Sequence, residues 1–580
     1  MIAIMRSVAN VFRIAGGGRP RIGAVALVLV GALLGTAPAL RAQTLPLTVR
    51  GHNLYAGARP AYLFGQGFWH AVVKGGFDMG AEADWYRPYG VNLTRVKTIT
   101  SRIVPSTSTT PENPWVRLAT GKYDLDRFNE TFWKRLDAFL QNNAETGRYV
   151  LLQIFDEVIT KEGDDAWDRH PLNPDNHING LTLPRTGQRG TPDIYDLRNT
   201  RLLDYYQRYL GRLLESTYQY RHVIYEISNE YTGTKEFLDW VLARIRAFEK
   251  ARQVDLLVTN MSCTPTLFNH EASAPDIDLL DFWHAPRSIR TLRIDEIYAN
   301  VTSLRASVSK PLLTGRIGLE PDRNDATPNY RRVARAQLWA ILMAGGVAAT
   351  TKEDYAGIEN GPPAYNLDAK WETQGFLGLH LLLHNLWQTG VFQARNDIIL
   401  SRPFTDVWAA AVGHEWVVYM VDVAGPGGGT LRLRNLPTGR YTAKLYDPGL
   451  GQVLRVDRLG VVDGTASIEV DPVSLGDRVV WLTPEPFDVA ARWEEQGGRR
   501  RCLIELRDFA SSGVFHAIFL NGKDVSTVIL PLFRPTAALP GGGLQFATPW
   551  MPLPGGVYEL VVWVQGSLGT DRSILRMQVD

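Results

Sequence analysis

The sequence His222-Val-Ile-Tyr-Glu-Ile-Ser-Asn-Glu230 decides the fold and also marks a candidate site. Its apolar and β-branched residues form a short run, which is typical of a buried strand. Asn229 and Glu230 end the run, and Thr234 follows them as a candidate N-cap of a helix. The stretch therefore predicts a buried strand that carries two polar side chains to its carboxyl end, directly before a helix.

Short apolar runs alternate with longer helical patterns from about residue 50 to residue 390. Leu202, Tyr206 and Leu210, for example, recur at the four-residue spacing of an amphipathic helix. This alternation is typical of parallel strands that are joined by helices. Eight strand candidates follow one another: Tyr62–Gly67, Leu93–Lys97, Tyr149–Phe155, Val223–Ile227, Leu256–Thr259, Leu279–Phe282, Pro311–Thr314 and Val347–Thr351. Eight such units predict an α/β fold, a (β/α)8 or TIM barrel.

Beyond Gln388 the pattern changes to short strands that are separated by Gly-rich and Pro-rich turns, such as Gly425–Gly429. We therefore expect two small β-sandwich domains after the barrel, with a linker at Pro484-Glu-Pro486. The expected division of the chain is a signal peptide over 1–42, the barrel over 43–390, a β-sandwich over 391–484 and a second, Ig-like β-sandwich over 485–580.

The first forty residues have the composition of a targeting segment. Four arginines between Arg6 and Arg21 precede the apolar run Ile22–Leu34, and small residues follow at Ala39 and Ala42. This order is that of a secretory signal peptide. An uncleaved anchor is the alternative, but the run is shorter than the roughly 20 residues that cross a bilayer. We expect export to the periplasm or the extracellular space, and no stable membrane span after processing.

Charge and cysteine content argue against two further classes of protein. The formal net charge is +2, and residues 1–42 hold five arginines and no acidic residue. Their removal changes the net charge to about −3, so we expect no basic surface for nucleic acid. The two cysteines, Cys263 and Cys502, lie far apart and in different expected domains. A disulfide framework is therefore not expected, despite export.

The carboxyl ends of the predicted strands are the places to search for a site, because active sites of barrels form there. A glycosidase needs a carboxylic acid that protonates the leaving oxygen, and Glu230 is the candidate for this role. Asn229 could hold a sugar hydroxyl, although both residue types also cap helices. Aromatic and imidazole groups end other strands: Trp69, His70, Trp283, His284 and Tyr355. They could line a sugar-stacking cleft, or else pack into the core.

Several segments together resemble a known family. Tyr225-Glu-Ile-Ser-Asn-Glu230 resembles the strand-four signature of the clan of retaining (β/α)8 glycoside hydrolases that includes cellulases and β-mannanases. Asn92-Leu-Thr-Arg95 resembles the strand-two segment whose Arg supports the catalytic carboxylates, and Tyr149–Phe155 resembles strand three. His170–Gly180 and Leu445–Gly451 are similar to a loop and a small β-domain of the apiosidase-like and uncharacterised cellulase-like branch. The resemblance covers roughly residues 50–480 and implies a carbohydrate substrate, with Glu230 as general acid/base.

One position departs from the family pattern. The family's nucleophile is a Glu that ends strand seven, but Lys310-Pro-Leu-Leu-Thr-Gly-Arg316 places Arg316 there. A guanidinium cannot attack an anomeric carbon. Close to Glu230, it would instead favour the ionised carboxylate over a proton donor. The mechanism of the family therefore cannot simply be transferred to this chain.

Other carboxylates could take the second catalytic role. Glu320 is favoured, because Gly318 allows the loop after Arg316 to turn back over the rim. Its reach allows either the retaining or the inverting separation from Glu230. Glu353 and Asp354 are the next candidates, and Asp156 or Glu157 could activate a water instead. The alternative for all five is a solvated rim or a salt bridge with Arg316.

Two functions from different classes fit these residues. The first is a secreted glycoside hydrolase acting on an oligosaccharide or polysaccharide, with Glu230 and Glu320 as its carboxylates. The second, which Arg316 favours, is a non-catalytic glycan-binding pseudo-glycosidase. The expected substrate-binding residues are Trp69, His70, Arg95, Asp156, Asn229, Trp283, His284, Arg316, Glu353 and Tyr355. The histidines lack the spacing of metal ligands, so we expect no metal and no required cofactor.

Overall fold

The computed structural model describes most of the chain from Thr44 onward. The described residues are 44–67, 71–73, 91–99, 112–156, 167–183, 193–284, 288–289, 292–317, 328–351, 390–422, 427–437, 439–449, 452–461, 464–473, 476–485, 488–497, 499–507, 513–520, 523–524, 534–539, 543–548, 556–566 and 569–579. The expected signal peptide lies outside these residues, so it stays a prediction.

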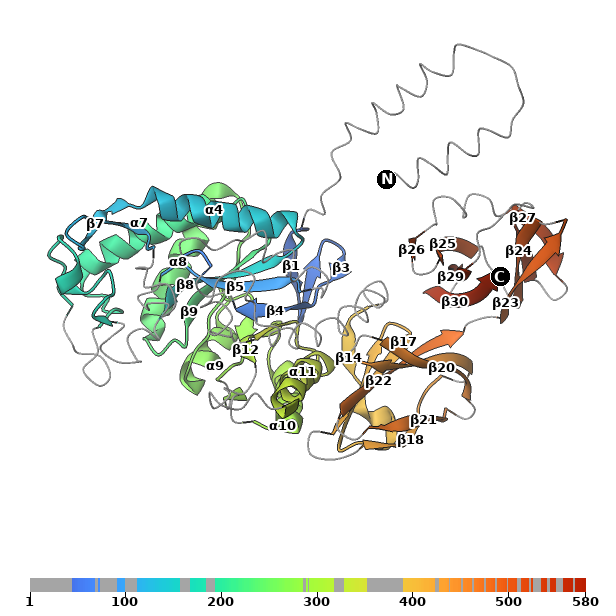
Figure 1. The fold of residues 1–580 in the computed structure, drawn as a ribbon. Coiled ribbons are helices and arrows are strands. Elements are labelled where there is room, and N and C mark those ends of the chain that lie inside the picture. The colour runs from blue at the N-terminus through green and yellow to red at the C-terminus, as the bar shows by residue number, and fades with distance from the viewer. Residues whose placement is uncertain are drawn as a thin grey trace, which may run out of the picture. The chain divides into compact units, whose positions relative to one another are not determined.

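Eight strands form one sheet in the first part of the fold (Figure 1). Their hydrogen-bonded order is β10-β9-β8-β5-β4-β13-β12-β11, and all neighbouring pairs are parallel. The strands are β4 (Leu63–Gly67), β5 (Leu93–Lys97), β8 (Tyr149–Asp156), β9 (Val223–Asn229), β10 (Leu257–Thr259), β11 (Leu280–Asp281), β12 (Leu312–Ile317) and β13 (Ala348–Thr351). The two end strands approach each other, because the backbone N–H groups of Asp278 and Leu279 donate to Val258 O at 2.9 and 3.3 Å. The predicted barrel is confirmed.

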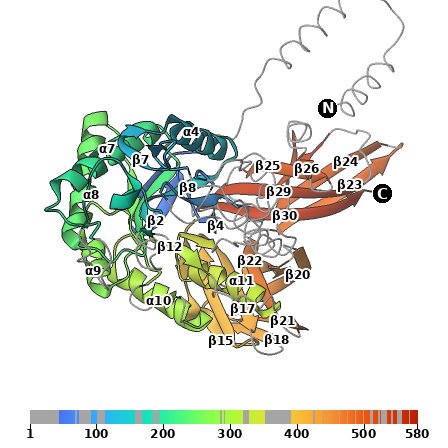
Figure 2. The ribbon, with the colours of Figure 1, turned by 60° about the vertical axis from the view of Figure 1, so that its left-hand side comes forward.

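Helices follow the strands and lie outside them, as Figures 1 and 2 show for α4, α7 and α8. The described helices are α4 (Glu130–Glu145), α7 (Thr200–Thr217), α8 (Lys235–Arg252), α9 (Pro265–Ser273), α10 (Ile294–Ser307) and α11 (Pro328–Met343), with 3-10 turns η2 (Pro174–Asn176) and η5 (Asn396–Ile398). Leu202, Tyr206 and Leu210 are buried on one face of α7, as their spacing predicts. Thr234 caps α8 by accepting the N–H of Phe237 at 3.2 Å. Within the described residues, no helix is both long and apolar enough to cross a bilayer.

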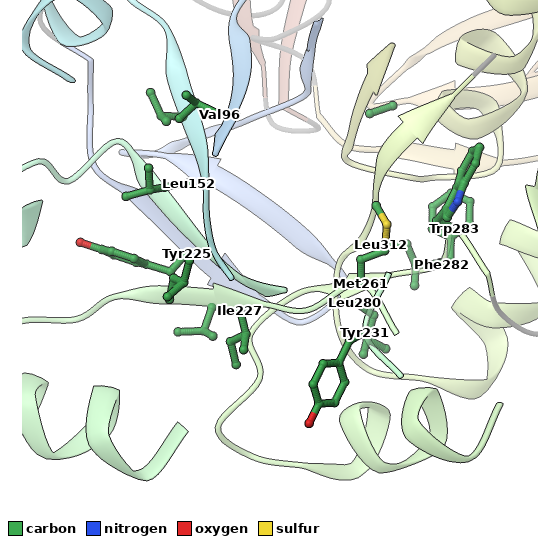
Figure 3. Close-up of a cluster of buried hydrophobic side chains, with 14 of the residues drawn as sticks. Val96, Leu152, Tyr225, Ile227, Tyr231, Met261, Leu280, Phe282, Trp283 and Leu312 are labelled. Carbon is green, nitrogen blue, oxygen red and sulfur yellow. The ribbon is translucent and has the colours of Figure 1, made fainter. Parts of the chain in front are cut away.

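Side chains on the barrel strands alternate between two surroundings. One set joins the core between strands and helices, and Figure 3 shows part of it: Val96, Leu152, Tyr225 and Ile227. The other set begins with a separate apolar layer near the amino ends of the strands: Leu63, Leu93, Leu151, Ile224, Leu257 and Leu313. Because the period of a strand is two residues, the next positions on that face include Arg95, Glu226 and Gly315, of which the first two carry charged side chains. The barrel interior therefore changes from apolar to polar toward its carboxyl end.

Antiparallel sheets make up the rest of the described chain. Small sheets accompany the barrel: β1 (Leu47–Arg50), β2 (Asn53–Ala56) and β3 (Arg59–Pro60) form one, and β6 (Trp115–Arg117) and β7 (Tyr123–Phe128) form another. A six-stranded and a three-stranded sheet then share a core, and their strands are β14 (Phe392–Ala394), β15 (Ile399–Ser401), β16 (Asp406–Val412), β17 (Glu415–Asp422), β18 (Gly427–Leu433), β19 (Gly439–Asp447), β20 (Gln452–Val461), β21 (Ala466–Val473) and β22 (Gly476–Glu485).

The last strands form two four-stranded sheets. They are β23 (Asp488–Gln496), β24 (Arg499–Arg507), β25 (Gly513–Leu520), β26 (Lys523–Asp524), β27 (Arg534–Leu539), β28 (Gly543–Ala547), β29 (Gly556–Gly566) and β30 (Gly569–Val579). A barrel followed by β domains is therefore confirmed, while the expected domain boundaries stay predictions.

Candidate functional site

Glu230 follows the last residue of β9, at the carboxyl end of the barrel sheet. Its backbone φ is +50°, in the left-handed region that residues other than glycine rarely adopt. This conformation costs about 1–2 kcal/mol. Hydrogen bonds of the next residue hold the bend, because Tyr231 N–H donates to Met261 O at 2.7 Å and Cys263 N–H donates to Tyr231 O at 2.8 Å. The backbone that carries Glu230 is thereby joined to the segment that follows β10.

Arg316, near the end of β12, forms an ion pair with Glu230. Its Nη1 donates to Glu230 Oε1 at 2.8 Å. The side chains of Arg316 and Glu230 are 9% and 21% exposed, so water screens the pair only in part. The guanidinium also lies 5.6 Å from the centre of the Trp283 ring, within the range of a cation–π contact. The contact with Arg316 therefore places a positive charge directly beside the carboxyl group of Glu230.

Arg95 organises the polar layer below this pair. The Arg95 side chain is fully buried, and both of its bonds to the carboxylate of Glu226 are charge-assisted, with Nε donating to Oε2 at 2.7 Å and Nη2 donating to Oε1. Nη2 also donates to Asn229 Oδ1 at 2.9 Å, and Nη1 donates to the carbonyl of Gly315 at 3.1 Å. Arg95 thus fixes the side chain of Asn229 beside Glu230 and joins β5, β9 and β12.

Asp281 and Gly315 complete this layer. Asp281 accepts the N–H of Gly315 at 2.7 Å and the N–H of Trp283 at 2.9 Å, so it positions the ends of β11 and β12. Burial, followed by the negative charge of Glu226, raises the pKa of Asp281 to about 7. A Cβ atom at Gly315 would lie 2.9 Å from Asp281 Oδ2 and 2.8 Å from the end of the Met261 side chain. Any larger residue at position 315 must therefore displace its neighbours.

A second buried acid supports the end of β9 from outside the barrel interior. The side-chain carbonyl of Asn260 accepts the N–H of Ser228 at 3.0 Å, and its amide donates to Glu271 Oε1 on α9 at 2.6 Å. Burial raises the pKa of Glu271 to about 8, against the lowering effect of the hydrogen bond from Asn260. Glu271 is therefore largely protonated at neutral pH, and it fixes the amide that holds the backbone two residues before Glu230.

Three different donor groups meet at the carboxyl ends of β9, β10 and β11. Ligand atoms of Glu230, Cys263 and His284 all lie within 4.8 Å of one another, and each residue is partly exposed. The His284 ring also packs edge to face against Trp283, with 5.9 Å between ring centres. The strand pattern in the sequence singles out Glu230 and His284 but not Cys263. Cys263 could have been found from its place after a predicted strand, once the barrel was accepted.

The structure brings together six of the residues expected at the site: Arg95, Asn229, Glu230, Trp283, His284 and Arg316. Asp156 ends β8 and is paired in register with Asn229, but its side chain lies outside the described residues. Five further predicted residues lie wholly outside them: Trp69, His70, Glu320, Glu353 and Tyr355. The second carboxylate therefore stays a prediction. Glu226, four residues before Glu230, is the buried partner of Arg95.

Comparison with known sequences identifies one family model. A model described as a domain of unknown function (DUF6298) matches residues 104–290, less than half of the chain. The matched stretch contains β8, β9 and the segment from Glu230 to His284. No curated protein matches the chain.

Solved structures resemble a larger part of the chain. One described as a glycoside hydrolase is 14% identical with a TM-score of 0.52, and the match covers 77% of this chain and 98% of that chain. A putative glycoside hydrolase from Bacteroides vulgatus has a TM-score of 0.52 at 14% identity, covering 77% and 83% of the two chains. A glycoside hydrolase family 5 protein from the same species has a TM-score of 0.53 at 14% identity, covering 76% and 94%. At this identity the likeness shows the fold alone, which is that of glycoside-hydrolase barrels.

Proposed function

We propose that this chain is a glycoside hydrolase that acts on an oligosaccharide or polysaccharide at the rim around Glu230. The observation that supports it most is the position of Glu230 at the end of β9, with Asn229 beside it held by Arg95 at 2.9 Å. Trp283 offers an aromatic side chain after the end of β11, close to Arg316, although it is nearly fully buried. A carboxylate, an amide and an aromatic group are the elements of a sugar-binding catalytic cleft.

The ion pair with Arg316 suggests which catalytic role Glu230 takes. A general acid must carry a proton before the reaction, whereas a general base must be ionised. Nη1 of Arg316 donates to Glu230 Oε1 at 2.8 Å, which is the geometry of an ion pair, so Glu230 is proposed as the base that activates a water. A second carboxyl group then supplies the proton, and Glu320 is favoured over Glu353 and Asp156. Such a pair would stand about 6.5–9.5 Å apart and invert the anomeric configuration.

A second candidate function is glycan binding without hydrolysis. The same Arg316 favours it, because the end of β12 carries a cation where the resembled clan has its nucleophile. A guanidinium paired with a carboxylate can still bind sugar hydroxyls. In this case the barrel would hold a glycan by hydrogen bonds and aromatic contacts, without bond cleavage.

The place of action is proposed to be the periplasm or the extracellular space. The support is the order of arginines, apolar run and small residues within 1–42, which is that of a signal peptide. Fractionation of cells that express the full chain, with mass spectrometry of its mature N-terminus, tests this. A chain that keeps its first residues in the cytoplasmic fraction contradicts export.

The test of function is a reducing-sugar release screen over polysaccharides and aryl glycosides. The wild-type chain is compared with Glu230→Gln, Glu320→Gln and Glu236→Gln, the last being an exposed control in the first turn of α8. We expect release to fall by about 10²-fold or more in the first two variants and to persist in the control. The anomer of the first product, followed by NMR, reports inversion or retention.

Two other outcomes would change the assignment. Release that persists in Glu320→Gln but not in Glu230→Gln moves the second role to Glu353 or Asp156. No release from any substrate, together with glycan retention in affinity electrophoresis that Glu230→Gln leaves intact, replaces hydrolysis with the binding function. Thermal unfolding of each variant confirms that loss of release is not loss of fold.

A further inference from the structure

We propose that Glu230, Cys263 and His284 form a binding site for a single Zn²⁺ ion at the rim of the barrel. Their ligand atoms, an oxygen, a sulfur and a nitrogen, lie within 4.8 Å of one another. The three residues come from the ends of β9, β10 and β11, which are separated by long stretches of sequence. Binding of the ion does not require that the chain be a hydrolase, but the ion shares Glu230 with the proposed function, and a carboxylate that ligates the ion does not serve as the general base at the same time. The two proposals are therefore tested separately, zinc binding without substrate and through Cys263 and His284.

The donor set selects zinc among the common divalent cations. Ca²⁺ and Mg²⁺ are bound by oxygen ligands, whereas thiolate and imidazole together are typical of Zn²⁺ sites. Structural zinc sites use four protein ligands, while catalytic sites use three and leave the fourth position to water or substrate. Glu230, Cys263 and His284 supply three, and all of them are partly exposed, so solvent can reach the ion.

The distances fit a tetrahedral site after small side-chain rotations. Zinc bonds of about 2.0–2.3 Å place tetrahedral ligand atoms about 3.3–3.6 Å apart, so the atoms need to close by at most about 1.5 Å. The backbone is already fixed around them. Tyr231 N–H donates to Met261 O, and Cys263 N–H donates to Tyr231 O. These bonds hold the backbone next to Glu230 against the backbone of Cys263. On β11, Asp281 accepts the N–H of Trp283, the residue before His284.

Arg316 is itself a cation that contacts one of the proposed ligands, Glu230. It contacts Glu230 through Oε1, and a carboxylate can bridge a guanidinium and a metal ion because it has two oxygens. Hydrogen bonds to a ligating carboxylate are a regular feature of metal sites. The charge of Zn²⁺ is offset by the Glu230 carboxylate and the Cys263 thiolate, so the ion and Arg316 do not face each other without intervening negative charge.

The site also accounts for the unusual backbone of Glu230. A left-handed φ of +50° costs about 1–2 kcal/mol at a glutamate, and a helix cap at this position does not need it. The bend keeps Glu230 next to the segment after β10, from which Cys263 projects. A water on the fourth position of the ion would be activated at neutral pH, which is chemistry that Arg316 does not provide.

Zinc binding is measured directly, without substrate. The full chain, prepared without a histidine tag, is stripped with a chelator and titrated with Zn²⁺ in a calorimeter, and metal content is determined by mass spectrometry after dialysis. We expect one Zn²⁺ per chain. Cys263→Ala and His284→Ala should each weaken binding by about 100-fold or more, since loss of even an outer partner of a metal ligand weakens binding by about 10–100-fold. Matched controls are Cys502→Ala, in the last β domain, and His270→Ala, whose ring bonds Asp239.

Cobalt provides a second readout that identifies the thiolate. Replacing Zn²⁺ with Co²⁺ should give a sulfur-to-cobalt charge-transfer band that is lost in Cys263→Ser and kept in Cys502→Ala. The proposal is overturned if the wild-type chain binds no stoichiometric Zn²⁺, or if binding is unchanged in both Cys263→Ala and His284→Ala. Zinc binding without sugar release would contradict the proposed hydrolase only, and sugar release from a chain that binds no zinc would contradict the metal site only.

Discussion

Arg316 and Glu230 join the ends of β12 and β9 through a contact of 2.8 Å between Nη1 and Oε1. The pair sets the charge of the candidate site, because it combines a cation with the carboxylate that the fold delivers to the rim. It also couples two strands that are not neighbours in the sheet order. Changes at Arg316 should therefore alter the position of the Glu230 side chain, while the backbone of β9 keeps its pairing with β8 and β10.

Arg316→Met removes this charge while keeping a long side chain. If Glu230 acts as a base, kcat/KM should fall by about 10-fold or more, because the carboxylate loses the donor that holds it in place at 2.8 Å. Arg198→Met is the control, since the side chain of Arg198, which pairs with Asp196, is 86% exposed. A kcat/KM equal to that of wild type would show that the pair with Arg316 does not position Glu230 for the reaction.

Arg95→Met should lower the free energy of unfolding by about 3–5 kcal/mol, because it leaves the buried carboxylate of Glu226 without its partner. Urea unfolding of the purified chain measures this difference. The double variant Arg95→Met with Glu226→Gln should recover part of the loss, since the uncompensated charge is then absent. A double variant that is as unstable as the sum of the single ones would contradict this coupling.

Glu271→Gln should change how stability depends on pH. Burial raises the pKa of Glu271 to about 8, above its value of about 4.3 in an unfolded chain. The stability that this group contributes is therefore present below about pH 4 and is lost as the pH rises toward 8. As the pH rises from about 5 to about 9, the free energy of unfolding of the variant should increase relative to that of wild type by on the order of 2–4 kcal/mol. Unfolding curves of wild type and Glu271→Gln at both pH values test the sign of this change. The control Glu236→Gln should show the same pH dependence of stability as wild type.

Gly315→Ala and Gly211→Ala should have opposite effects. A Cβ at Gly315 meets Met261 and Asp281 below 3.0 Å, so we expect a loss of about 1–3 kcal/mol. At Gly211, inside α7, a Cβ meets nothing within 4 Å, so the higher helix propensity of alanine should add about 0.5–1 kcal/mol. Thermal unfolding distinguishes the two. Equal effects at both positions would contradict the close packing around Arg95.

The barrel could be predicted from sequence because each of its strands is a short buried run, and the run before Glu230 is the clearest. The inward position of Glu226 also follows from the two-residue period that it shares with Ile224. Its pairing with Arg95 could not be predicted, because the partner lies on β5 and the distance depends on how the sheet closes. The same is true of Cys263, whose neighbours are set by three strand ends rather than by spacing along the chain. Glu320 lies outside the described residues and the sequence around it carries no periodic pattern, so its place at the rim stays a prediction.

The left-handed backbone at Glu230 has a consequence for how this position can evolve. Glycine, asparagine or aspartate would adopt the same φ with a lower conformational free energy. If the glutamate side chain had no function, substitution by one of these residues would therefore be favoured. A glutamate that persists in related chains would therefore mark a position retained for its chemistry, against the preference of its own backbone. A glycine at this position, together with loss of Cys263 or His284, would identify related chains in which the barrel has lost the function of the Glu230 side chain.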